Sequence, residues 1–242
     1  MKAPEKIPDE LYDSYSMDGK ITIDYHYRND CSEQVQEQIN ANFTQEEFDK
    51  CIRKIKNKEW NYYHYTDAWL YLALEKYPIK GKHVCIAGSA YPWYEAMAIV
   101  HGASKCTVIE YSDRTSFHPD IEYIKPGEEQ GRLFDACFSI SSYEHDGLGR
   151  YGDPLNPNGD LEAMQNLKKI LKKDALLYLS VPMGEDKVFF NVHRVYGLNR
   201  FPLLIKNWYG LTLFGGRQDI WTNNYNTAEE TIYQPVHVLR NT

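Results

Sequence analysis

Short apolar runs alternate along the chain with segments in which apolar residues recur every three or four positions. The short runs are bounded by turn-forming or charged residues, which predicts buried strands. They lie at residues 83–87, 105–111, 121–124, 134–140 and 175–181. The periodic segments at 93–101 and 160–171 predict helices. This alternation is typical of an α/β fold with a mostly parallel sheet, because parallel strands are usually joined by helical crossovers.

The part of the chain before these strands has a helical pattern. Thr44 and Glu47 match a capping box, in which each side chain binds the other residue's backbone N–H. Apolar residues follow at helical spacing. A second helix is expected to begin near Thr66 and to end before Pro78.

The pattern divides the chain into two parts. We expect an N-terminal helical cap over residues 1–80, with a short strand near 20–25, and a Rossmann-like domain over residues 81–242. Two further apolar runs, at 211–214 and 236–239, predict an antiparallel strand pair at the C-terminal end.

A candidate cofactor site lies at the end of the first predicted strand. Gly88 follows this strand and leads through Ser89 and Ala90 into a helix, so bare backbone and free N–H groups meet there. Glu110, followed by Tyr111, ends the second strand, where a carboxylate commonly binds ribose hydroxyls. The alternative is that Gly88 only forms a tight turn and Glu110 is a solvated strand end.

The loop at Gly88 departs from the dinucleotide-binding pattern. The sequence continues Gly-Ser-Ala-Tyr-Pro-Trp, which puts Pro92 and Trp93 where a pyrophosphate needs bare backbone. This departure disfavours NAD and FAD. A smaller cofactor without phosphate, S-adenosylmethionine, fits better.

The stretch 139–160 concentrates acidic residues, glycines and a histidine, and long loops in compact domains are often functional. His145, between Glu144 and Asp146, is our candidate general base, with either acid as its orienting group. The same acids could instead hold a divalent metal through oxygen ligands. The remaining interpretation is that the acids build turns and caps, and for Asp160 we expect the N-cap of the next helix.

Further polar residues are candidates for contacts with a substrate. They are Arg150, Asp153, His193, Arg194, Tyr196 and the tyrosine-rich cluster at residues 62–65. The tyrosines could instead seal the N-terminal segment onto the domain. An arginine such as Arg194 can clamp a phosphate or carboxylate, but it can equally form a salt bridge with the acidic loop.

Composition narrows the class of partner. The formal net charge is −7, from 27 basic and 34 acidic residues, which argues against a nucleic-acid partner. No apolar run approaches the ~18 residues of a membrane span. Five widely spaced cysteines without a CxxC pair favour a reducing, cytoplasmic location and no structural zinc.

The loop sequence carries a resemblance to a known family. The run Ser-Tyr-Glu-His-Asp-Gly-Leu-Gly-Arg-Tyr-Gly-Asp-Pro-Leu-Asn-Pro-Asn-Gly-Asp, with His-Arg-Val-Tyr-Gly at 193–197, resembles a family named only as a domain of unknown function. That family looks similar to class I S-adenosylmethionine-dependent methyltransferases. The resemblance implies a Rossmann-like sheet of that type and cofactor contacts at residues 87–90, Glu110, Ser141 and Ser142.

These observations lead to one main functional hypothesis. We expect an S-adenosylmethionine-dependent O-methyltransferase that acts on a small polar acceptor, such as a sugar or glycan hydroxyl, with no nucleic acid or membrane as partner. One alternative is a glycan- or nucleotide-sugar-binding protein without methyl transfer. The other is a metal-dependent hydrolase or transferase centred on the acids around His145.

Overall fold

The structure, a computed structural model, describes residues 3–28, 30, 41–129 and 131–242. Its main element is a seven-stranded sheet in which β4 to β6 run parallel, while β10 is antiparallel to both of its neighbours. In spatial order the strands are β4 (Ile121–Ile124), β3 (Lys105–Ile109), β2 (His83–Ala87), β5 (Phe134–Ile140), β6 (Leu171–Ser180), β10 (Val236–Asn241) and β9 (Trp208–Phe214). The predicted parallel strands and the C-terminal antiparallel pair are confirmed.

The order of these strands defines the fold class. From β2 the chain adds β3 and β4 on one side, then returns to place β5 and β6 on the other side. The order therefore reverses between β2 and β5, and open α/β sheets bind ligands at such a switch point. With β10 inserted between β6 and β9, the sheet is Rossmann-like and of the class I methyltransferase type, as predicted.

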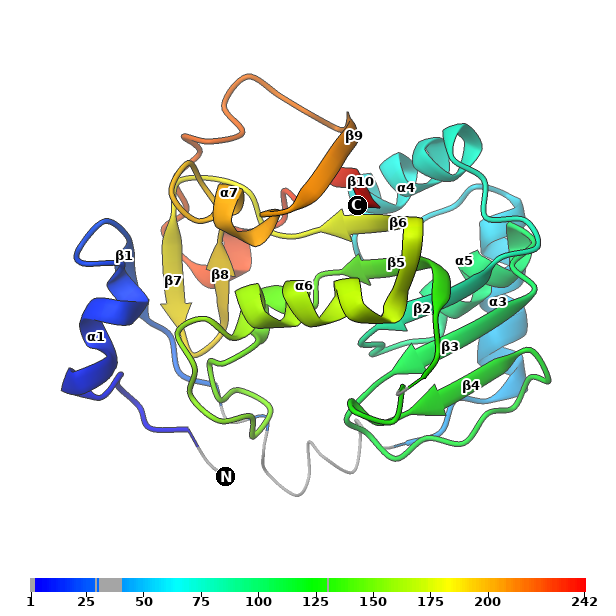
Figure 1. The fold of residues 1–242 in the computed structure, drawn as a ribbon, viewed down its shortest axis with the longest axis horizontal. Helices are drawn as coiled ribbons and strands as arrows, with labels where there is room; N and C mark the ends of the chain where they lie inside the picture. The colour runs from blue at the N-terminus through cyan, green and yellow to red at the C-terminus, as the bar shows by residue number, and fades with distance from the viewer. Residues whose placement is uncertain (1–2, 29, 31–40, 130) are drawn as a thin grey trace.

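Helices cover both faces of this sheet (Figure 1). On one face α5 (Trp93–Val100) and α4 (His64–Lys76) pack on the strands, and α3 (Gln45–Lys56) packs on α5. On the other face lie α6 (Gly159–Ile170) and α7 (Phe201–Leu204). The predicted capping box is present at the start of α3.

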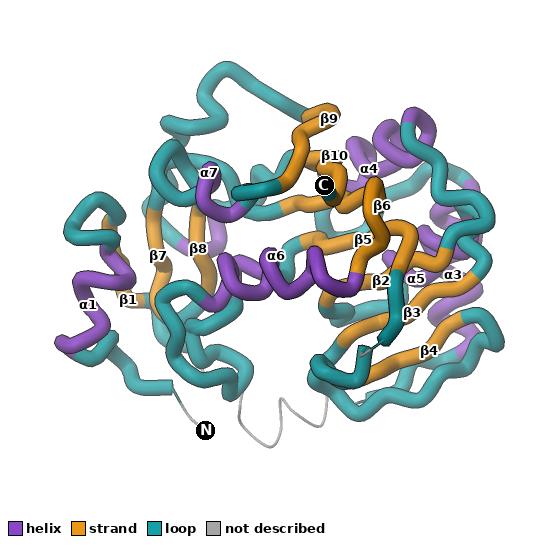
Figure 2. Tube along the Cα trace, in the orientation of Figure 1, coloured by secondary structure: helices purple, strands orange, loops and turns teal. Residues whose placement is uncertain are grey.

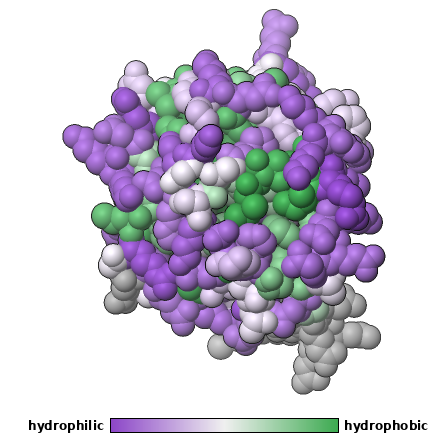
Figure 3. Space-filling model, turned by 90° about the vertical axis from the view of Figure 1, so that its right-hand side faces the viewer, coloured by the Kyte–Doolittle hydropathy of each residue, from purple (hydrophilic) through white to green (hydrophobic). Residues whose placement is uncertain are grey.

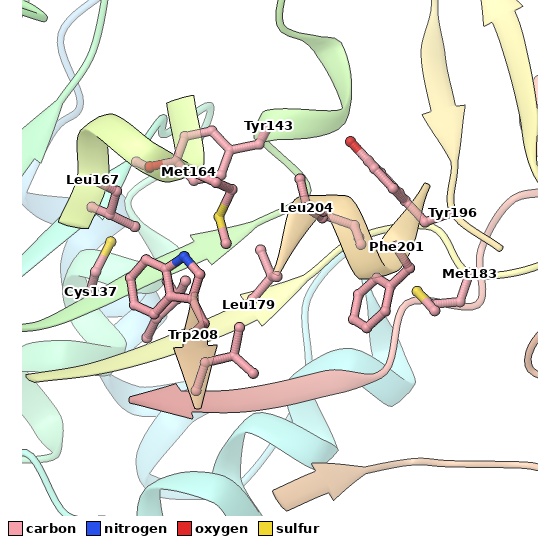
Figure 4. Close-up of a cluster of buried hydrophobic side chains, with 14 of the residues drawn as sticks. Cys137, Tyr143, Met164, Leu167, Leu179, Met183, Tyr196, Phe201, Leu204 and Trp208 are labelled. Carbon is pink, nitrogen blue, oxygen red and sulfur yellow. The ribbon is translucent and has the colours of Figure 1, made fainter. Parts of the chain in front are cut away.

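Side chains of the central strands alternate between two apolar cores. In β6, Leu177 and Leu179 enter the core under α6, while Leu176 and Tyr178 enter the opposite core. Figure 4 shows the first of these cores, where Trp208 of β9 lies beside side chains of α6 and β6. Because each fully buried large apolar side chain contributes about 1.5–3 kcal/mol, burial on both faces fixes the register of the sheet.

A smaller sheet joins an N-terminal strand to the segment between β6 and α7. It has the order β1 (Thr22–Tyr25), β7 (Lys187–Phe190), β8 (His193–Val195), with β1 parallel to β7. The first residues thus supply the helix α1 (Asp9–Ser16) and a strand, besides the helices α3 and α4. The division of the chain at residue 80 stays a prediction.

The strands β7 and β8 were not predicted, because they have only four and three residues and include Lys187, His193 and Arg194, which leaves too little apolar pattern. Long loops connect the elements around this smaller sheet, as Figure 2 shows. The loop from β5 to α6 is one of them, and it contains the 3-10 turn η1 (Tyr143–His145).

The structure also bears on two expectations from composition, which concern membrane spans and the cysteines. No helix within them is long and apolar enough to cross a membrane. Four cysteines, Cys51, Cys85, Cys106 and Cys137, are free and buried, while Cys31 lies outside the described residues.

The side of the molecule that is on the right in Figure 1 is mostly polar, with one apolar patch near its middle (Figure 3).

Candidate functional site

Three strand ends meet at the switch point of the large sheet. Gly88, after β2, has a φ of +73°, and a Cβ placed on it would lie 2.9 Å from Ser142 Oγ, after β5. The same Cβ would lie 3.8 Å from Glu110 Oε2, after β3. The structure therefore brings together Gly88, Glu110 and Ser142, and only glycine leaves room between them.

Ser89 is held by charged side chains from different elements. Its N–H donates to Glu110 Oε2 at 2.8 Å, and its hydroxyl donates to Glu95 Oε1 at 2.6 Å. Its carbonyl accepts from the Arg114 guanidinium. Tyr123 also donates to Glu95, at 3.1 Å, and burial raises the pKa of Glu95 to about 7. Sequence reasoning missed Glu95, Arg114 and Tyr123, because their contacts with this turn come from a helix, a loop and a strand and leave no local sign in the sequence.

The residues present fit a nucleoside cofactor. Glu110 accepts backbone N–H groups from Ser89 and, at 2.7 Å, from Tyr111, but a carboxylate has about four lone-pair positions and can still accept ribose hydroxyls. Ala90 is exposed beside the turn. Trp93, which we expected to crowd the turn, is buried in the apolar core below α5.

A second group of side chains lies at the end of β5. Glu144, in η1, is fully buried, and its Oε1 accepts from Ser141 Oγ at 2.6 Å. Ser141 Oγ in turn accepts from Tyr63 Oη at 2.9 Å and from Gln234 Nε2 at 3.3 Å. Burial raises the pKa of Glu144 to about 7. Tyr63 lies in the predicted tyrosine cluster, whereas the amide from before β10 gave no sequence signal.

His145 is a neutral imidazole in this structure. Its Nδ1 lies 2.7 Å from the carbonyl oxygen of Val192, so this nitrogen carries the proton and Nε2 is left as an acceptor. Burial lowers the pKa of His145 well below its ordinary value, and the neighbouring Arg150 lowers it further. Nε2 is 3.8 Å from Glu144 Oε1. The expected orienting carboxylate is thus replaced by a backbone carbonyl.

Asp146 and Asp153 differ in their surroundings. Burial, and then the nearby charge of Asp153, raise the pKa of Asp146 to about 8. Asp153 accepts backbone N–H groups from Gly147 at 2.7 Å and from Gly149 at 3.1 Å. In this structure Asp153 therefore stabilises the conformation of the loop. Its role in substrate binding stays a prediction.

Asp160 is not the N-cap of α6, contrary to our expectation. The N-cap is Asn158, and Asp160 lies fully buried in the first turn. It accepts from Arg200 Nε and from Tyr196 Oη, both at 2.9 Å, and lies 3.8 Å from Arg194 Nε. Burial alone would raise its pKa, but Arg194 and Arg200 outweigh that effect and lower it. The buried ion pairs, which a local pattern cannot reveal, thus decide the position of this carboxylate.

The other predicted substrate contacts have protein partners. Arg194 donates to the carbonyl of Asp146 at 2.6 Å, so the structure gives it the second of its two expected roles, contact with the acidic loop. Arg150 forms an ion pair with Asp30 at 2.6 Å. His193 Nε2 lies 2.7 Å from Thr231 Oγ1, after the 3-10 turn η2 (Ala228–Glu230).

Metal chemistry gains no support from the geometry. Within the described ranges, no group of three or more His, Cys, Asp or Glu side chains is placed to hold a metal ion. The acids of the loop and His145 therefore do not form a metal-binding set in the part of the chain that the structure covers.

Solved structures with a similar fold include three methyltransferase-type proteins. An N-methyltransferase, NodS, from Bradyrhizobium japonicum is 15% identical over 72% of this chain and 92% of its own, with a TM-score of 0.44. An S-adenosylmethionine-dependent methyltransferase from Mesorhizobium loti is 13% identical over 72% and 98%, with a TM-score of 0.47. A candidate methyltransferase from Streptococcus mutans is 12% identical, with a TM-score of 0.47; this chain covers 48% of its length with 72% of its own.

Sequence comparison places the chain in a family. No curated protein matches the sequence. A family model described as "Caenorhabditis protein of unknown function, DUF268" matches residues 81–235, which include the whole loop from β5 to α6. The predicted resemblance to a domain of unknown function is thereby confirmed, and the chain belongs to the DUF268 family.

Proposed function

We propose that this protein is an S-adenosylmethionine-dependent O-methyltransferase whose acceptor is the hydroxyl group of a small polar molecule, such as a sugar. One observation carries the proposal: Gly88, Glu110 and Ser142 converge at the switch point of a class I methyltransferase-type sheet. A bare backbone turn beside a carboxylate at this position suits a nucleoside without phosphates.

Each of these residues has a distinct task in the proposed site. Gly88 lets the backbone approach the cofactor closely, and Glu110 accepts hydrogen bonds from its ribose. S-adenosylmethionine, when bound, supplies a methyl group on a positively charged sulfur. The Glu110 carboxylate beside the Gly88 turn favours a cationic group over an anionic one.

The acceptor is expected to be neutral. The cationic side chains near the loop are engaged with the protein, since Arg150 pairs with Asp30 and Arg194 donates to loop carbonyls. An anionic acceptor would therefore meet carboxylates at this edge of the sheet, and its approach would be unfavourable. Hydroxyl groups, in contrast, find hydrogen-bond acceptors there.

Calorimetric titration with S-adenosylhomocysteine, the demethylated product, tests the cofactor site. The purified full chain should bind it, and Gly88→Ala should weaken binding at least about 10-fold, because the added Cβ would lie 2.9 Å from Ser142 Oγ. Glu110→Gln should also weaken binding, through loss of the carboxylate.

Gly81→Ala is the matched control. Gly81 has a similar φ of +75°, but an added Cβ meets nothing within 4 Å, so this variant has the same backbone strain without the contact. Absence of binding to the wild-type chain would refute the proposed function. Binding of the product without transfer to any hydroxyl would favour a binding protein instead.

A further inference from the structure

A continuous chain of hydrogen bonds links three elements at the end of β5. Tyr63, which precedes α4, donates its phenol proton to Ser141 Oγ at 2.9 Å. Ser141 donates its own proton to Glu144 Oε1 at 2.6 Å. All donors in this chain thus point the same way, from the half-buried phenol towards the fully buried carboxylate.

Ser141, in the middle of this series of hydrogen bonds, is fixed in place. Ser141 has a φ of +52°, which is costly for a residue other than glycine, and such strain tends to persist at functional sites. Gln234 donates its amide to Ser141 Oγ at 3.3 Å. The backbone carbonyl of Gln234 is itself held by Thr66, at 2.7 Å, and by Ser180, at 2.8 Å. The Ser141 hydroxyl therefore has a defined direction for its proton.

Glu144, at the end of this series of hydrogen bonds, can take up a proton. Glu144 Oε2 is buried and has no hydrogen-bond partner among the described residues. The burial that raises the pKa of Glu144 to about 7 makes the neutral and charged forms nearly equal in free energy at neutral pH. The titratable and charged groups around Glu144 are Tyr63, His145, Asp146, Arg150, Tyr151, Arg194 and Tyr196.

His145 is less suited to this task. Its Nε2 is free to accept, but burial and Arg150 both disfavour the protonated ring. A proton moved to His145 would create a buried cation, whereas a proton moved to Glu144 removes a buried charge.

We propose that Tyr63, Ser141 and Glu144 form a proton relay that removes the proton of the acceptor hydroxyl. This inference rests on the proposed function. The acceptor O–H bond breaks and its electron pair stays on the acceptor oxygen, while its proton passes to Tyr63 Oη. The phenol proton passes to Ser141 Oγ, and the serine proton passes to Glu144 Oε1. The net result is one broken O–H bond on the acceptor and one new O–H bond on the carboxyl group.

Carbon-13 NMR of the full chain with labelled glutamate carboxyl groups tests the relay without cofactor or acceptor. One signal should titrate near neutral pH and be absent in Glu144→Gln. Ser141→Ala should raise its midpoint by about 0.5 pH unit or more, because the charged carboxylate loses a donor. Tyr63→Phe should raise it by less. Tyr209→Phe, an exposed tyrosine on β9, is the matched control. A titration midpoint that is the same in the wild type, Ser141→Ala and Tyr63→Phe would overturn the proposal.

Methyl transfer supplies the second readout. The probe is radiolabelled S-adenosylmethionine with a panel of methyl glycosides, alcohols and phenols, between pH 5 and 9. The wild-type rate should rise with the ionisation of Glu144 seen by NMR. Tyr63→Phe and Ser141→Ala should lower the rate about 10²-fold, and Glu144→Gln at least as much with loss of that rise. Tyr63→Phe and Glu144→Gln should keep their affinity for S-adenosylhomocysteine, whereas Ser141 is also an expected cofactor contact.

The outcomes separate the relay from the proposed function. A wild-type chain that binds no S-adenosylhomocysteine contradicts the proposed function, whatever the NMR titration gives. Normal binding and transfer in Glu144→Gln, with transfer lost in His145→Gln, would refute the relay alone and make His145 the base.

Discussion

The segment from the end of β5 to the first turn of α6 has two halves that hold their carboxylates differently. In the second half, Asp153 accepts from backbone N–H groups and Asp160 from buried cations and a phenol. In the first half, Glu144 has an oxygen without a partner among the described residues, and Asp146 has a pKa raised to about 8 by burial. The same residue types, in one segment of the chain, thus have several hydrogen-bond or ion-pair partners in one half and are buried with fewer partners in the other.

This contrast distinguishes a structural half from the half to which we assign the proposed proton transfer. A carboxylate that is paired and hydrogen-bonded fixes the backbone around it. A buried carboxyl group with a pKa near neutrality exchanges protons readily, and such groups concentrate at functional sites. Arg194 connects the two halves, because it donates to the carbonyl of Asp146 and approaches Asp160.

The largest expected effect is on Asp160. Asp160→Asn keeps the shape of the side chain but leaves Arg194 and Arg200 without their buried counter-charge. The free energy of unfolding should fall by about 3–5 kcal/mol, measured by urea denaturation. A loss below about 1 kcal/mol, the usual limit for exposed pairs, would contradict the contrast between the halves.

Glu144→Gln should change the free energy of unfolding in the opposite direction. The pKa of Glu144 rises from 4.5 to about 7 on folding, so the wild type is stabilised by the neutral form at low pH and loses this stability as the pH rises through about 7. The variant should therefore be more stable than the wild type by about 3 kcal/mol at pH 8, and by little at pH 4. Thermal melts across this pH range measure the difference; a constant difference at all pH values would exclude the raised pKa.

Arg194→Lys tests the connection between the halves. A lysine cannot reach the carbonyls that the guanidinium contacts on both sides of the loop, and this should cost about 1–3 kcal/mol in urea denaturation. Arg240→Lys, on the half-exposed surface of β10, is the control and should change stability by less than about 0.5 kcal/mol. Equal effects of the two variants would show that Arg194 does not hold the halves together.

The smallest effect is expected for Asp153→Asn. The amide oxygen can still accept from Gly147 and Gly149, but without the negative charge that strengthens both bonds. Stability should fall by about 1 kcal/mol, seen as a decrease in Tm of about 2–4 °C. A decrease as large as that of Asp160→Asn would mean that the loop depends on net charge rather than on the ion pairs.

The sequence predicted the large sheet well because its strands are buried on both faces and bounded by turn residues. β2, β4 and β5 begin and end where the pattern placed them. The small sheet was not predicted as a sheet, although a strand near 20–25 was expected. Its strand β8 has only three residues, and β7, the antiparallel neighbour of β8, pairs on its other side with β1, which is distant in sequence. Asp160 was misplaced for a related reason: Arg200 is distant in sequence, and a local capping preference is weaker than a buried ion pair.

The sequence by itself determined the α/β class, the strand ends that carry Gly88 and Glu110, and the acidic character of the loop after β5. Those properties follow from local periodicity and from residue type. Only the tertiary structure decided which acid is paired and which ring nitrogen of His145 carries the proton. It also decided that Tyr63 contacts Ser141, which in turn contacts Glu144. The reason is physical: burial and long-range contacts set the charge state of a side chain, and neither is encoded in its immediate neighbours.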